Sequence, residues 1–175
     1  LEAAWAMTPP TLQDALRAAA DRIREVHAAQ RDATIRGIAS AHLVPRALRR
    51  AGCYIPGGRA AYPSTVLMNV IPAQLAGVAS VAIASPPAPA GGVHRHVAAA
   101  AHLLGITEVH AVGGAQAIAA LAYGTESIAR ADVITGPGNL FVTLAKRLVF
   151  GEVRIDGVAG PREILVIASA DADAT

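Results

Sequence analysis

Apolar side chains recur at helical spacing near the start of the chain. Over residues 8–30 they fall on one face of a predicted amphipathic helix, formed by Leu12, Leu16, Ala19, Ile23 and Val26. Thr8 is placed to cap this helix, and the two prolines that follow it suit a first helical turn. Residues 31–50 show no clear periodicity, so we expect at most some short strand there.

Short apolar runs alternate with helix-forming stretches from residue 51 onward. Strands are predicted at residues 53–55, 80–85, 108–112, 132–135, 153–155 and 164–168. Helices are predicted at residues 63–76, 94–104, 115–123 and 139–149. Strands that are apolar throughout and alternate with helices are typical of a parallel sheet covered on both faces. The sequence therefore predicts an α/β fold, a parallel sheet flanked by helices.

A glycine-rich turn follows three of the predicted strands. Each turn has a polar side chain beside it: Tyr54 with Gly57-Gly58, Gln116 with Gly113-Gly114, and Asn139 with Gly136-Pro137-Gly138. Because the carboxyl ends of parallel strands share one edge of a sheet, we expect the turns to meet at a ligand-binding crevice. The turn at Gly113 also opens a helix, whose unpaired N–H groups suit a phosphate. The Gly-x-Gly-x-x-Gly fingerprint and the Walker A pattern do not occur in the sequence.

Composition narrows the class of protein. The 175 residues are 53% hydrophobic and 16% charged with a net charge of +2, which fits a folded domain and disfavours nucleic acid as a partner. No apolar run approaches the roughly 20 residues that span a membrane. The single cysteine, Cys53, fits a reducing cytoplasm, and its apolar neighbours favour a buried, inert thiol. The chain begins at Leu1 and stops at Thr175, so we expect a piece of a longer protein.

The positions of the titratable side chains in the sequence do not define a metal site or an acid–base pair. His94 and His96 are two positions apart, which places them on different faces of a helix, and no cysteine or carboxylate cluster completes a metal-ligand set. Solvated or helix-capping histidines are therefore the favoured interpretation. Glu126 and Asp132 are candidates for acid–base chemistry, with a role at a helix end or in a loop favoured for each.

Several motifs together resemble the histidinol dehydrogenase family. In order, they are Tyr54-Ile55-Pro56-Gly57-Gly58, Tyr62 through Met68, Gly113 through Ser127, Gly136-Pro137-Gly138-Asn139 and Ala159-Gly160-Pro161. The resemblance covers nearly the whole chain and implies a cytoplasmic homodimer that uses NAD and zinc. Such an enzyme oxidises L-histidinol via L-histidinaldehyde to L-histidine, the last two steps of histidine biosynthesis.

The resemblance also implies roles for parts of the chain. Tyr54, Gln116 and Asn139, the same residues that the turns single out, are implied to bind NAD. Residues 1–53 are implied to be part of a first domain, residues 54–161 an incomplete-Rossmann-like NAD-binding domain, and residues 162–175 the start of the return to the first domain. The family's zinc ligands and its Glu-His acid–base pair are expected downstream of this chain, which leaves no catalytic or metal-binding residue within it.

One position departs from the family pattern. The family continues Gly-Pro-Ser-Glu with a serine that contacts substrate, whereas this chain has Gly160-Pro161-Arg162-Glu163. Arg162 is larger and cationic, and the amine of histidinol is cationic too. Two alternatives therefore stay open: a related alcohol dehydrogenase of the same family with another, anionic substrate, and a catalytically inactive nucleotide-binding paralogue.

Overall fold

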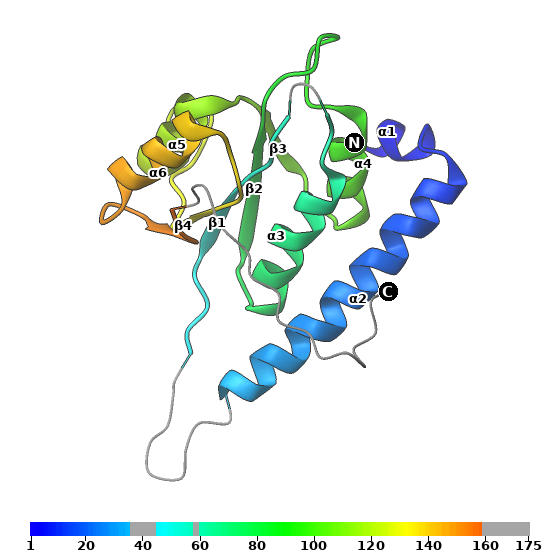
Figure 1. Ribbon diagram of the computed structural model, residues 1–175, viewed down its shortest axis with the longest axis horizontal. Helices are drawn as coiled ribbons and strands as arrows, with labels where there is room; N and C mark the ends of the chain where they lie inside the picture. Colours follow the sequence, from blue (N-terminus) through cyan, green and yellow to red (C-terminus); the bar gives the residue numbers. More distant parts are fainter. Residues whose placement is uncertain (36–44, 58–59, 159–175) are drawn as a thin grey trace, which may run out of the picture.

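The computed structural model describes residues 1–35, 45–57 and 60–158 (Figure 1). The elements in chain order are α1 (Glu2–Ala6), α2 (Pro10–Ile35), β1 (Arg50–Tyr54), α3 (Pro63–Leu75), β2 (Ser80–Ser85), α4 (Arg95–Leu103), β3 (Glu108–Ala111), α5 (Gly114–Tyr123), β4 (Val133–Thr135), α6 (Leu140–Val149) and β5 (Arg154–Ile155). The predicted strand at residues 164–168 lies outside the described residues. Each other predicted helix and strand has its counterpart in this series.

The five strands form one parallel sheet in the order β3-β2-β1-β4-β5. Strand β1 is central, since Cys53 aligns with Ile83 of β2 on one side and with Thr135 of β4 on the other. The chain builds outward from β1 to β3 and then crosses to β4, so the direction of winding changes between β1 and β4. Doubly wound sheets bind ligands at such a switch point, beyond the carboxyl ends of the strands. The predicted α/β class is confirmed.

Two hydrophobic cores cover the two faces of the sheet. Because successive residues of a strand point to opposite faces, Cys53 packs with α3 and α4, whereas Tyr54 packs with α5 and α6. Figure 1 shows these two pairs of helices on opposite sides of the sheet. Helix α5 lies close against β1, since a Cβ at Gly52 would stand 2.9 Å from the side chain of Leu121.

The N-terminal helices share the core of α3 and α4. Leu16 and Ala20 of α2 are buried in that core, α2 lies against α3, and α1 lies against α4. The boundary predicted between residues 53 and 54 falls inside β1, whose pairing with β2 runs from Arg50 to Tyr54. Within the described residues, no helix combines the length and apolar character that crossing a bilayer requires.

Some local features at the N-terminus differ from the prediction. Helix α1 is too short to show a periodic pattern, and it is held by tertiary contact, with the Trp5 ring centroid 6.2 Å from that of His102 on α4. The hydroxyl of Thr8 donates to the carbonyl oxygen of Ala4 at 2.8 Å, so it closes α1 and does not cap α2. Helix α2 continues past its predicted end through residues that lack apolar periodicity.

Strand β1 begins earlier than predicted, at Arg50. A charged residue normally marks the limit of an apolar strand, but the Arg50 guanidinium has partners on β2 and on β3, the two strands on one side of β1. It donates to the hydroxyl of Ser80 at 2.7 Å and to Oε2 of Glu108 at 2.8 Å. These partners are distant in sequence, so the local pattern does not reveal them.

Candidate functional site

A hollow of about 380 Å³ lies at the carboxyl edge of the sheet, where the switch point predicts a ligand site. Residues that follow four different strands line it: Tyr54, Pro56, Gly57, Pro86, Pro87, Gly113, Gly114, Gly138 and Asn139. The structure thus brings together the three glycine-rich turns that the sequence singles out.

Tyr54 joins the end of β1 to the start of α5. Its side chain is only 3% exposed and belongs to the core beneath α5 and α6. Its hydroxyl oxygen accepts a hydrogen bond from the backbone N–H of Gly114 at 3.2 Å. The phenolic proton is left to donate, so Tyr54 both braces the turn and offers a donor at the edge of the hollow.

The turn at Gly113 and Gly114 requires glycine. A Cβ at Gly113 would stand 2.5 Å from the Pro86 side chain, and Gly114 has φ +68°, a conformation that other residues rarely adopt. Gly113 is the N-cap of α5, so the first N–H groups of that helix border the hollow with the positive end of its dipole.

Gln116 lies beside the hollow and does not line it. Its side chain is exposed, and its Oε1 is so near the turn that a Cβ at Gly114 would stand 2.8 Å away. The carboxamide therefore lies over the first turn of α5 with donors and an acceptor available to a ligand.

Asn139 caps the second helix that meets the hollow. Its Oδ1 accepts from the backbone N–H of Val142 at 3.1 Å, in the geometry of a helix N-cap. The cap uses the oxygen of the carboxamide and leaves the Nδ2 donors for a ligand. The preceding Gly138 is pressed against α6, since a Cβ there would stand 2.3 Å from Cγ1 of Val142.

Sequence reasoning missed one wall of the hollow. Pro86 and Pro87 follow β2, and both line the cavity beside Gly113. The same rule that joined the glycine turns would have found them, because β2 is parallel to β1 and ends at the same edge. Arg162, the other candidate residue, lies outside the described residues.

The remaining titratable residues have structural roles or exposed positions where the structure describes them. His94 caps α4 by accepting from the N–H of His96 at 3.2 Å on Nδ1. Within the described residues, no group of three or more His, Cys, Asp or Glu side chains is placed to hold a metal ion. Cys53 is fully buried, and burial raises the pKa of its thiol to about 11. Glu126 is exposed in the loop after α5.

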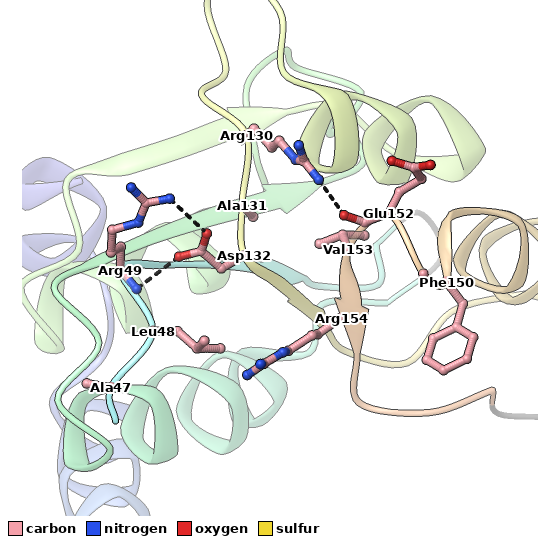
Figure 2. A pocket seen from close by; sticks show the side chains of 11 residues that line it. Ala47, Leu48, Arg49, Arg130, Ala131, Asp132, Phe150, Glu152, Val153 and Arg154 are labelled. Atoms are coloured by element: carbon pink, nitrogen blue, oxygen red, sulfur yellow. Dashed lines mark hydrogen bonds and ion pairs between the residues drawn. The ribbon is translucent and has the colours of Figure 1, made fainter. Parts of the chain in front are cut away.

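A larger hollow of about 670 Å³ lies at the opposite, amino edge of the sheet (Figure 2). Several of its polar groups bind other parts of the chain. Oδ2 of Asp132 accepts from the backbone N–H groups of Arg50 and Arg49, at 3.0 and 2.9 Å, and these bonds lower the pKa of the carboxyl. The Arg130 guanidinium donates to the backbone carbonyl of Glu152, as Figure 2 shows. Asp132 is therefore a loop carboxylate that ties β4 to β1, and it lies far from the predicted site.

The strand order and the glycine-lined hollow at the switch point define a doubly wound α/β domain. The family model described as histidinol dehydrogenase matches residues 1–175. The chain belongs to the histidinol dehydrogenase family.

Relatives of this family resemble the chain in sequence and in structure. Curated histidinol dehydrogenases from Prochlorococcus marinus strain MIT 9313 and Parasynechococcus marenigrum strain WH8102 are 56% and 55% identical to it over 98% of its length. The crystal structure of histidinol dehydrogenase from Elizabethkingia anophelis matches with a TM-score of 0.87 at 40% identity, over 98% of this chain and 41% of that one. The chain spans 40% of the length of the two curated relatives.

Proposed function

We propose that this chain forms the NAD-binding part of a histidinol dehydrogenase. The reaction is the NAD-dependent oxidation of L-histidinol via L-histidinaldehyde to L-histidine, in histidine biosynthesis. Family membership supports the reaction, and the hollow at the switch point supports the part that this chain plays in it. The observation that carries the proposal is that the N-caps of two helices, Gly113 and Asn139, line one cavity from opposite halves of the sheet.

The described residues fit a dinucleotide. Two helix N-termini offer unpaired N–H groups to a pyrophosphate, and glycine at the turns lets the backbone approach it. The phenol of Tyr54 and the carboxamide nitrogens of Gln116 and Asn139 supply donors around the same edge. Bound NAD would accept a hydride from the substrate alcohol. The residues of this chain would hold and orient the cofactor and exclude water from its buried side.

The described residues do not fit the zinc ion that the family implies. They hold no group of three His, Cys, Asp or Glu side chains that would coordinate a metal. We therefore assign no zinc ligand to them. We further propose, from the family, a cytoplasmic homodimer in which residues 162–175 and the part of residues 1–53 that precedes β1 belong to a first domain, and the sheet that includes all of β1, up to residue 161, to the NAD-binding domain.

Titration of NAD into the 175-residue chain by calorimetry tests the proposal. We expect saturable binding, weakened by Asn139→Ser, because serine keeps the helix cap and removes the Nδ2 donor. Asn69→Ser is the matched control, since the Asn69 amide donates to the carbonyl of Thr65 within α3 and does not line the hollow. Absence of NAD binding to the unsubstituted chain would contradict the proposal, as would an equal effect of both substitutions.

A second candidate keeps the family and changes the substrate. Arg162 stands where the family has serine, and a cation there favours an anionic substrate. A chimera in which residues 1–175 replace the matching segment of the Prochlorococcus marinus relative would distinguish the two. Oxidation of L-histidinol by the chimera supports the first candidate. Oxidation that appears only after Arg162→Ser supports the second.

A further inference from the structure

Helix α6 carries a buried cation close to the hollow but not in its lining. Lys146 is only 3% exposed. Its Nζ donates to the backbone carbonyl oxygen of Gly136 at 3.0 Å and to Oδ1 of Asp156. Neither Lys146 nor Asp156 lines the hollow, so neither is placed to touch a ligand there.

Asp156 of the same ion pair also binds the backbone N–H of Gly136. The second carboxylate oxygen of Asp156, Oδ2, accepts from the backbone N–H of Gly136 at 2.8 Å. Asp156 comes directly after β5, and Lys146 lies in the second half of α6. One peptide position at the end of β4 is therefore fixed on both its donor and its acceptor by side chains from two other elements.

Gly136 starts the turn that leads to the pocket residues Gly138 and Asn139. Its φ is +112°, and a Cβ there would stand 1.9 Å from the carbonyl oxygen of Tyr54, so glycine alone fits. The turn is thus pressed against the end of β1 on one side and held by the Lys146–Asp156 pair on the other. A change in that pair would shift the residues that follow Gly136.

An ion pair with a buried partner contributes little net stability compared with apolar side chains of the same volume, because the buried charge, here that of Lys146, loses its water. What it supplies is a directed set of hydrogen bonds. We propose that Lys146 and Asp156 are positioning residues, which fix the turn of residues 136–139 so that the free amide of Asn139 faces the cofactor. The inference rests on the proposed binding of NAD to this hollow.

The test compares two partly buried ion pairs in the 175-residue chain. Lys146→Met removes the charge and the donors at similar length. Glu108→Gln is the control, because it weakens the Arg50–Glu108 pair, whose atoms bond across the strands at their amino ends and away from the hollow. For each variant, the melting temperature and the dissociation constant of NAD are measured.

We expect both variants to lower the melting temperature, and only Lys146→Met to weaken NAD binding. The dissociation constant of NAD should rise by about tenfold, which corresponds to the loss of one hydrogen bond to a charged group. A wild-type NAD affinity in Lys146→Met would overturn the inference, and so would an equal loss of affinity in Glu108→Gln. If the unsubstituted chain binds no NAD, the proposed function itself fails, which is a different result.

A second variant covers the case in which Lys146→Met does not fold. Asp156→Asn keeps an oxygen near the N–H of Gly136 but removes the charge that holds Lys146. We expect the amide resonance of Gly136 to move in its ¹⁵N-correlated spectrum and NAD affinity to fall. An unmoved Gly136 resonance together with unchanged affinity would overturn the inference.

Discussion

The hydroxyl of Tyr54 accepts a hydrogen bond from the backbone N–H of Gly114 at 3.2 Å, although the two residues are 60 positions apart. This bond joins the central strand to the first turn of α5 at the edge of the hollow. It explains why a tyrosine ends a strand whose other buried residues, Ala51, Gly52 and Cys53, are small.

Tyr54→Phe removes this acceptor while keeping the ring. We expect the free energy of unfolding to fall by about 1 kcal/mol, the net worth of an ordinary hydrogen bond. Affinity for NAD should fall as well, because the turn loses its brace. Tyr123→Phe is the control, since Tyr123 is 61% exposed on the last turn of α5 and should change the unfolding free energy by less than about 0.5 kcal/mol. Urea unfolding of both variants measures the difference, and equal effects would contradict the assigned role.

Alanine substitutions at Gly136 and Gly151 distinguish the energetic cost of backbone strain from that of a steric clash. Both have positive φ, +112° and +105°, but a Cβ at Gly136 meets the carbonyl of Tyr54, whereas Gly151 has nothing within 4 Å. We expect Gly151→Ala to cost about 1 to 3 kcal/mol from strain alone. Gly136→Ala should cost about 4 kcal/mol or more, because the clash adds to the strain. Denaturant titration that ranks the two variants the other way would show that β1 and β4 are not packed this tightly.

The Arg50–Glu108 pair should make stability depend on acidic pH. The hydrogen bond from Arg50 lowers the pKa of Glu108 below its usual 4.5, so the folded state favours the ionised form. The unfolded chain then binds the proton more readily, and this contribution to stability is present above pH 4.5 and lost as the pH falls through the lowered pKa. Unfolding free energies measured between neutral and acidic pH should fall less steeply for Glu108→Gln than for the unsubstituted chain. The exposed Glu126 gives the control variant Glu126→Gln, for which an equally flattened profile would contradict the assignment to Glu108.

Cys53 should be inert in the folded protein. Its side chain is fully buried, and its pKa is raised to about 11, which leaves very little reactive thiolate near neutral pH. We expect a thiol-specific colorimetric reagent to label it only as fast as the chain unfolds, and at once in denaturant. Rapid labelling under native conditions would place Cys53 outside the core.

The 175-residue chain should bind NAD without oxidising histidinol. Within the described residues, no group of three or more His, Cys, Asp or Glu side chains is placed to hold the zinc ion that would help the alcohol lose its proton. We expect no NADH to form from L-histidinol and NAD, with or without added zinc, as followed by NADH absorbance. Zinc-dependent NADH formation that persists after repeated purification would contradict this prediction.

The glycine-rich turns are the part of the candidate site that the sequence alone predicts. Gly113 and Gly138 stand out because glycine between an apolar strand and a helix has few other uses, and parallel strands bring such turns to one edge. Pro86 and Pro87 also follow a strand that ends at this edge. Proline commonly ends a strand, however, so these two residues do not by themselves indicate a ligand site. The sequence alone does not predict the Lys146–Asp156 pair. Its two side chains meet at the backbone of Gly136, and only the tertiary structure brings them there.

The sequence by itself determined the α/β class, because apolar strands that alternate with helices have few ways to bury their faces. It also determined that Tyr54, Gln116 and Asn139 flank turns at one edge of the sheet. Only the tertiary structure decided how those side chains are used: Tyr54 as a brace, Asn139 as a cap with a free amide, and Gln116 beside the hollow. Such roles depend on partners that are distant in sequence, so no local pattern records them.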